Sequence, residues 1–108
     1  MLHKKEFTKS LDKLGQERLR VKMVINKGKL TDLVFQYESF INGHWEEIVR
    51  YDIAHGFFHR DFINAKGEKE KVRIEIQDLK TAATFAEQDI KDKWEFYKSK
   101  YIKTIKKK

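Results

Sequence analysis

The change of hydrophobic period along the chain is the feature that most constrains its fold. From Arg18 onward apolar residues alternate with polar ones, as in the run from Leu19 to Ile25, and this two-residue period is typical of a strand with one buried face. After Asp78 the period becomes helical, and a single apolar stripe is formed by Ala86, Ile90, Trp94, Tyr97, Tyr101 and Ile105. The sequence therefore predicts a sheet over residues 18–76 followed by a helix over residues 81–106.

Five strands are expected in this sheet, separated by short turns that contain Asn or Gly. The expected strands cover residues 18–25, 30–41, 45–53, 57–63 and 71–76. The dipeptide Asn42-Gly43 between two apolar runs is the strongest short signal for a hairpin. Since every connection is short enough for a hairpin, we expect an antiparallel meander in sequence order.

The N-terminal segment has a different pattern. Phe7, Leu11 and Leu14 recur at helical spacing and a glycine follows them, which predicts a short amphipathic helix over residues 3–14. The expected fold class is α+β, in one domain of residues 1–108. It consists of a five-stranded antiparallel meander sheet, the short N-terminal helix, and the long C-terminal helix packed on one face.

The positive charge lies mostly at the C-terminal end. Of the net charge of +7, residues 91–108 contribute +6, because they hold eight lysines against Asp92 and Glu95. Lysines in the last turns of a helix offset its macrodipole, and the Lys-rich tail of residues 106–108 favours solubility. The alternative is sequence-independent contact with nucleic-acid phosphate. The candidate residues for that contact are Arg60, Lys98, Lys100, Lys103 and Lys106.

Composition excludes several classes of function. The chain has no cysteine, so disulfides, zinc–thiolate sites and cysteine nucleophiles are excluded. No Gly-rich phosphate loop is present, and no cofactor is expected. The sequence shows neither an apolar run of about 18 residues nor a signal peptide, so we expect a cytoplasmic protein without membrane contact. Abundant Lys and Glu with scarce Asn, Gln and Met predict a thermophilic source.

Residues 50–61 form the most informative segment, because two histidines, two carboxylates and two arginines cluster there. If Asp52 pairs with Phe57 across the hairpin, Arg50 lies opposite His59 and the polar side chains separate from the apolar ones. A slip of one residue, which pairs Ile53 with Phe57, would reverse every side chain and is the alternative. The favoured register places one polar group on a single face, formed by Arg50, Asp52, His59 and Asp61. Continued through the preceding turn, it adds Phe35 and Tyr37 to that face, so both faces are expected to be mixed.

Three kinds of chemistry fit this segment. In metal-independent RNA cleavage His59 would be the general base or acid, Arg50 or Arg60 would stabilise the phosphorane, and Asp52 would orient the imidazole. The RNA 2′-hydroxyl then supplies the nucleophile. A metal site formed by His55, His59 and a carboxylate is the second possibility. A structural ion network is the third. The candidate catalytic residues are Arg50, Asp52, His55, His59 and Asp61.

The order Arg-aromatic-Asp-x-x-His, followed shortly by a second His, resembles the centre of small prokaryotic proteins of the TumE-like toxin type. The matching positions are Arg50, Tyr51, Asp52, His55 and His59, and the resemblance covers residues 18–76. It implies a small α+β domain that acts on RNA as an endoribonuclease of toxin–antitoxin type, with RNA and a cognate antitoxin-like protein as partners. The alternatives are a non-catalytic homo-oligomeric interaction module and a metal-binding domain. If the site is catalytic, His59 should be needed for activity and hardly for stability.

Two aromatic residues of the expected C-terminal helix lie off its apolar stripe. Phe85 and Phe96 are eleven residues apart, which is about three turns, and they lie roughly opposite the stripe. One helix cannot bury both of its sides against one sheet. The N-terminal helix or a second subunit must cover them, and we expect a homodimer.

Overall fold

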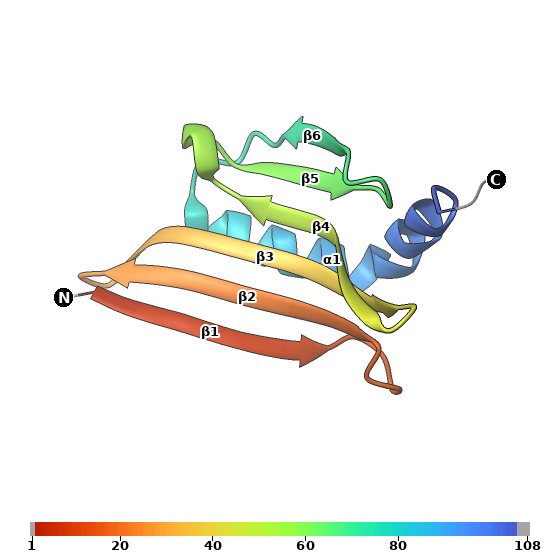
Figure 1. Cartoon of the computed structure of the whole chain (residues 1–108). Coiled ribbons are helices and arrows are strands. Elements are labelled where there is room, and N and C mark those ends of the chain that lie inside the picture. The colour runs from red at the N-terminus through yellow and green to blue at the C-terminus, as the bar shows by residue number, and fades with distance from the viewer. Residues whose placement is uncertain (1, 106–108) are drawn as a thin grey trace.

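The computed structural model describes residues 2–105, which form one six-stranded antiparallel sheet and one long helix (Figure 1). The strands follow one another in the sheet in sequence order, β1 to β6. A 3₁₀ turn, η1 (Ala54–Gly56), connects β4 to β5, and the helix α1 (Leu79–Ile102) follows β6. The strands are β1 (Leu2–Ser10), β2 (Glu17–Asn26), β3 (Lys29–Ile41), β4 (His44–Asp52), β5 (His59–Ile63) and β6 (Lys69–Arg73).

The N-terminal segment is a strand, so the predicted helix over residues 3–14 and the predicted count of five strands are wrong. β1 pairs with β2 from Leu2–Asn26 to Ser10–Arg18. A helix of about three turns with so few apolar residues gains too little from packing to offset its nucleation, whereas pairing with β2 satisfies the backbone at once. Only Phe7 of β1 is half-buried, which explains why the two-residue alternation is absent. The exposed lysines of β1 are typical of an edge strand that is protected against pairing with another chain.

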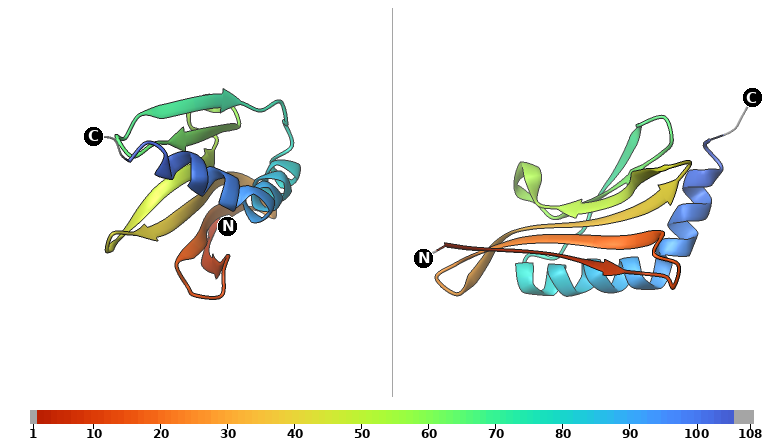
Figure 2. Two further views of the ribbon diagram at one scale, coloured as in Figure 1. Left: turned by 90° about the vertical axis from the view of Figure 1, so that its right-hand side faces the viewer. Right: turned by 60° about the horizontal axis from the view of Figure 1, so that its bottom comes forward.

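The helix begins two residues earlier than predicted and ends earlier. Asp78 is the N-cap, and its carboxylate accepts a hydrogen bond from the Thr81 N–H at 3.1 Å. The helical residues end at Ile102, and the predicted end at Lys106 lies outside the described residues. In Figure 2 the helix runs lengthwise along one face of the twisted sheet. Within residues 2–105 no helix combines the length and apolar character needed to cross a membrane.

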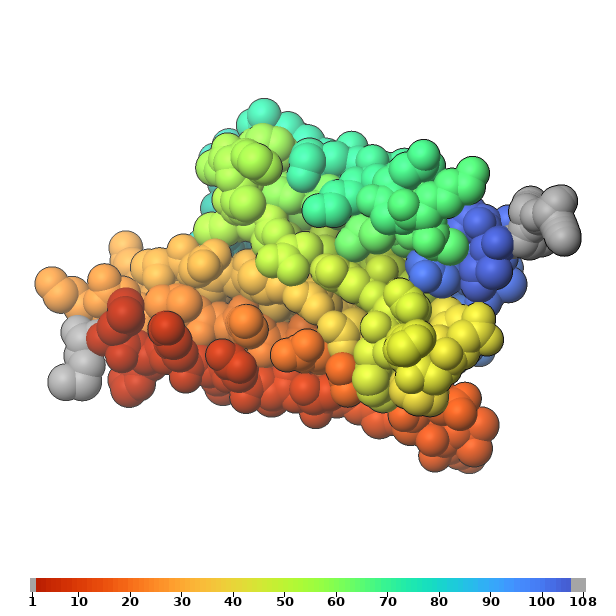
Figure 3. Space-filling model, viewed as in Figure 1, coloured from red at the N-terminus to blue at the C-terminus, as the bar shows by residue number. Residues whose placement is uncertain are grey.

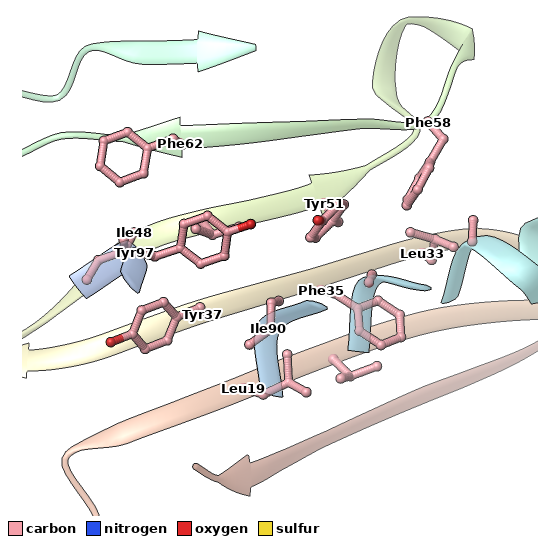
Figure 4. Close-up of a cluster of buried hydrophobic side chains, with 14 of the residues drawn as sticks. Leu19, Leu33, Phe35, Tyr37, Ile48, Tyr51, Phe58, Phe62, Ile90 and Tyr97 are labelled. Carbon is pink, nitrogen blue, oxygen red and sulfur yellow. The ribbon is translucent and has the colours of Figure 1, made fainter. Parts of the chain in front are cut away.

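The core lies between α1 and the facing side chains of β2 to β5 (Figure 4). The helix contributes small and medium residues, Ala82, Ala86 and Ile90, which let it approach the large residues of the sheet. Asp89 also belongs to the buried side, whereas Trp94 is half-buried and Ile105 is exposed. The fully buried sheet residues are Leu19, Tyr37, Ile48, Val49 and Tyr51.

A β-bulge in β4 determines which side chains face the helix. Tyr37 pairs with Val49, but Glu38 pairs with Glu47, so Ile48 is an extra residue on β4. Ile48 and Val49 are both fully buried although they are consecutive. This shift of one residue separates the two faces of the sheet, and the expectation that both faces are mixed is wrong.

The face of the sheet opposite α1, hereafter the open face, is mostly charged. Figure 3 shows the molecule from this side, with β1 and β2 below and the β5–β6 hairpin above. On this face Gln36 pairs with Arg50, and Phe35 lies instead opposite Tyr51 on the helix side. The polar residues of the segment 50–61 are therefore on the open face, away from the helix.

The two aromatic residues off the helix stripe have different surroundings. The Phe85 ring packs edge-on against Tyr51 and Phe58, with centroid distances of 6.0 and 6.4 Å. Phe96 contacts the Tyr97 ring and remains 62% exposed. No N-terminal helix is present within residues 2–105 to cover either of them.

We expect Ile90→Ala to destabilise the fold by about 2–5 kcal/mol, because Ile90 is fully buried between helix and sheet. Urea unfolding followed by circular dichroism measures the change. The matched control is Glu95→Ala, at an exposed position of the same helix, which should change the free energy of unfolding by less than about 0.5 kcal/mol. Equal losses in the two variants would contradict the assignment of the helix faces.

Candidate functional site

The β4–β5 hairpin brings the polar residues together in a register that differs from the favoured one by two residues. Asp52 lies opposite His59, and Arg50 lies opposite Asp61. The prediction that Arg50 lies opposite His59 is therefore wrong. A difference of two residues leaves each side chain on the same face of the sheet, so Arg50, Asp52, His59 and Asp61 share the open face.

The loop of residues 53–58 accounts for the difference. His55 and Gly56 both have positive φ, 72° and 83°, a conformation that non-glycine residues adopt uncommonly. The Asp52 carboxylate accepts a hydrogen bond from the Ala54 N–H at 3.0 Å and so holds the start of the loop. The longer loop folds over the open face and brings the rings of His55 and Phe57 within 6.0 and 5.3 Å of the His59 ring, measured between centroids.

His59 is the centre of this site, and its side chain is only 1% exposed. Its Nε2 atom lies 2.9 Å from Asp52 Oδ1 and 3.7 Å from Asp61 Oδ2. Its Nδ1 atom lies 3.2 Å from the carbonyl oxygen of Phe57. Both ring nitrogens therefore face acceptor oxygens. No ring nitrogen is left to act on a substrate.

The surrounding side chains extend this site into a polar network that crosses the open face from β2 to β6. Arg50 Nε donates to Asp52 Oδ2 at 2.7 Å, and Arg50 Nη1 donates to the Gln36 amide oxygen at 3.0 Å.

The network continues from this centre toward both edges of the sheet. On the β6 side Lys71 donates to Asp61 at 3.0 Å. On the β2 side the network continues from Gln36 to Glu38, which also accepts from Arg18 and Arg20. From β2 to β6, each strand thus contributes a charged or amide side chain that pairs with a side chain of the neighbouring strand.

The ionisation of Asp52 reflects this network. Burial raises the pKa of the Asp52 carboxyl, but hydrogen bonds from Arg50 and the Ala54 N–H, together with the nearby His59, outweigh burial and hold the pKa below its ordinary value. Burial lowers the pKa of Arg50, but its bond to Asp52 and the charge of Glu47 more than compensate, so the pKa is raised. Both partners are therefore kept charged.

His55 differs from His59 in being exposed on the surface of the loop. Beside it, the Arg73 guanidinium lies 4.9 Å from the centroid of the Phe57 ring. The predicted metal site would need His55 and His59 to converge with a carboxylate. Within residues 2–105 no group of three or more His, Asp or Glu residues is arranged to hold a metal ion.

The residues predicted to bind nucleic acid do not form one free basic surface. Lys98 is paired with Glu17, and Lys100 is paired with Glu70 at 3.0 Å. Arg60 lies on the helix side, where its guanidinium is within 3.5 Å of the Tyr51 hydroxyl. Lys103 is exposed just after α1, and Lys106 lies outside the described residues.

A second buried polar group was not identified from the sequence. Asp89 of α1 accepts hydrogen bonds from the hydroxyls of Tyr51 and Tyr97 at 2.6 and 2.5 Å. Burial and the bond to Asp89 raise the pKa of Tyr97 to about 12. The only available signal was an acidic residue one position before Ile90 in the apolar stripe. The bond from Tyr51 ties the helix to β4, and the bond from Tyr97 lies within the helix.

The lowered pKa of Asp52 predicts a specific loss of stability in acid. A carboxyl with a lowered pKa in the folded state contributes stability that is fully present above its unfolded pKa, about 3.9, and is lost as the pH falls through the folded value. Asp52→Asn should therefore be less stable than the parent chain near pH 6 and should lose less stability below about pH 4. Urea midpoints across this range measure the slopes. Glu95→Gln, at an exposed helix position, should keep the parent slope, and an unchanged slope in Asp52→Asn would refute the assignment.

Comparison with known proteins places the chain in a family without settling its activity. No curated protein and no solved structure matches the chain significantly. Residues 2–107 match a family described as a domain of unknown function, DUF7718. Since this match spans nearly the whole sequence, the chain belongs to the DUF7718 family.

Proposed function

We propose that this protein is a non-catalytic interaction module whose polar motif organises the sheet. The observation that carries the proposal is the burial of His59 with both ring nitrogens engaged. A general base or acid must reach the proton that it transfers, directly or through one water. A side chain that is 1% exposed and already holds two acceptors does not meet that requirement.

The connectivity of the network supports a structural role. β5 and β6 lie at the edge of the sheet, and β6 is exposed at all five of its residues. The pairs Asp52–His59 and Asp61–Lys71 join β4 to β5 and β5 to β6 on the open face. They hold a hairpin whose other face is only partly covered by the helix. A paired network of this kind favours one register over its alternatives.

The test is the effect of His59 on stability and on RNA. We expect His59→Ala to destabilise by about 3 kcal/mol, because it removes one partner from each of two buried carboxylates and leaves a gap where a fully buried ring was. His55→Ala, at an exposed position of the loop, should change stability by less than about 0.5 kcal/mol. Thermal unfolding measures both variants.

The same samples should not cleave a mixed-sequence single-stranded RNA. If the parent chain cleaves this RNA the proposal is wrong, and loss of cleavage in His59→Ala, kept folded at low temperature, would then assign the activity to His59.

An endoribonuclease of toxin–antitoxin type is the second candidate, and the exposure of His55 favours it. In that case His55 is the general base, and Arg50 and Arg73, both partly accessible, hold the phosphate. His59 then only positions the loop. This candidate predicts RNA cleavage that His55→Ala abolishes without loss of stability.

Assembly into a homodimer is part of the proposed module. Phe96 is 62% exposed on the side of α1 that faces away from the core, and burying such a ring favours association. Sedimentation of the parent chain should give a mass above 13.0 kDa at high protein concentration. Phe96→Ser should return it to the monomer mass, whereas Phe40→Ser, at an exposed position of β3, should not. A parent chain that remains monomeric would contradict this part.

A further inference from the structure

The free edge of β6 carries an unpaired row of backbone groups. β6 pairs with β5 alone within the described sheet, and Figure 1 shows it as the uppermost strand. The Ile74 N–H donates to the Phe58 carbonyl oxygen across the β5 side. Alternate residues of an antiparallel strand bond to opposite neighbours. The N–H and C=O groups of Lys69, Lys71 and Arg73 therefore point to the free edge.

The side chains of the same three residues line the open face beside this edge. Lys69, Lys71 and Arg73 are all basic, all exposed, and all on one face because they alternate along the strand. Asp61 pairs with Lys71 and Glu75 with Arg73, at 3.0 Å in each case, so an acidic strand would share these two cations with acids of the chain itself. In any antiparallel pairing of β6 with β6 of a second copy, residues of this set would lie opposite each other. Like charges directly opposite destabilise a strand pair. The edge is thus unsuited to a second copy and complementary to an acidic strand.

A cavity begins where β6 ends. It has a volume of about 330 Å³ and lies between the loop of residues 53–58 and the segment of residues 73–79. Its walls combine apolar side chains with the polar residues Arg73, Glu75 and Gln77. The apolar lining residues are Ile53, Phe57, Phe58, Ile74, Ile76 and Leu79. An edge strand with an adjoining apolar pocket is the arrangement by which proteins bind extended peptides as an added strand.

We infer that β6 binds an extended acidic segment of a partner protein, which adds a seventh strand to the sheet. This inference rests on the proposed function and names the partner class. The bound segment runs antiparallel to β6, with acidic residues opposite Lys69, Lys71 and Arg73 and apolar residues between them beside Val72. A large apolar side chain near its N-terminal end fills the cavity, because that end lies beside Arg73. Main-chain hydrogen bonds supply affinity, and the cavity with the basic row supplies specificity.

A single-stranded RNA could also be attracted to the basic row, but two observations favour a peptide. The three side chains share a strand with outward backbone donors and acceptors, which a peptide backbone satisfies residue by residue. The Phe57 ring already lies against the Arg73 guanidinium and lines the cavity. RNA binding to single strands depends instead on aromatic faces on which bases stack.

The experiment uses the full chain and an acetylated peptide that begins with phenylalanine and continues with alternating glutamate and valine. We expect saturable binding by calorimetry, and slowed amide exchange at Lys69, Lys71 and Arg73 in NMR spectra. Replacing the phenylalanine of the peptide by alanine should weaken binding about tenfold, because the cavity is left unfilled. A peptide of the same composition with all glutamates consecutive should not protect these amides. Its binding with equal affinity would overturn the inference.

Two charge reversals locate the site on the protein. Lys69→Glu should weaken binding of the acidic peptide about fivefold at low salt. Lys4→Glu makes the same change at an exposed position of the other edge strand, β1, and should leave the affinity unchanged. Equal effects of the two variants would mean that the peptide is attracted by the overall charge of the protein, and would refute the assignment of the binding site to β6.

Single-stranded oligouridylate is the second probe. Protection of the β6 amides by this RNA, with no protection by the peptide, would overturn the inference in favour of nucleic acid. Failure of the peptide to bind overturns the β6 site alone, since the proposed function is tested separately by RNA cleavage and by the stability of the His59→Ala variant.

Discussion

The extra residue Ile48 in β4 is the constraint on which the two faces of the sheet depend. It sits inside a ladder that is regular on both sides, and it allows Ile48 and Val49 to be buried in succession. On the face of the sheet that α1 covers, the extra residue places Tyr51 opposite Phe35. On the open face it aligns Arg50 with Gln36. Without this shift, aromatic residues of β3 would share a face with the arginine and aspartate of β4, and neither the core nor the polar network could close.

The two faces then stabilise the fold in different ways. The helix side is a packed apolar layer, joined to the helix by a buried carboxylate, Asp89, that accepts from two tyrosines. The open face has no covering element within residues 2–105, and its buried acids are shielded by their partners and by the loop that carries His55 and Phe57. Paired charges replace a second layer there. This is why His59, on a face without a helix, is among the most buried side chains.

Much of this architecture could be predicted from the sequence, and the exceptions have physical causes. Alternation located β2 to β5, and the stripe from Ala86 to Tyr101 located the helix, because in both cases one face is buried. The strand expected over residues 71–76 lies instead at Lys69–Arg73, where all five residues are exposed. β1 was missed since an edge strand that buries little but Phe7 has no alternation to detect. The bulge left only a weak signal, the adjacent apolar pair Ile48-Val49. The β4–β5 register depended on positive φ at His55, which its residue type does not require.

In the candidate site, too, some features could be predicted from the sequence and others could not. The sequence predicted correctly that four polar residues share one face: Arg50, Asp52, His59 and Asp61. Side chains alternate between the two faces of a strand, so an error of two residues in the register leaves each side chain on its predicted face. Their burial could not be predicted, because it depends on how the loop of residues 53–58 folds back. The pairing of Lys98 and Lys100 with acids on β2 and β6 joins residues far apart in the sequence, so charge counting alone overestimated the free basic surface.

The order of elements along the chain has a consequence for how the protein is made. All strand pairs join neighbours in sequence, so each hairpin can form as soon as its second strand leaves the ribosome. The helix that covers their apolar face follows all six strands along the chain, so it is synthesised after them. Until then Leu19, Phe35 and Tyr51 have only water or another chain to contact. A nascent or prematurely terminated chain that lacks α1 is therefore the species most in need of a chaperone.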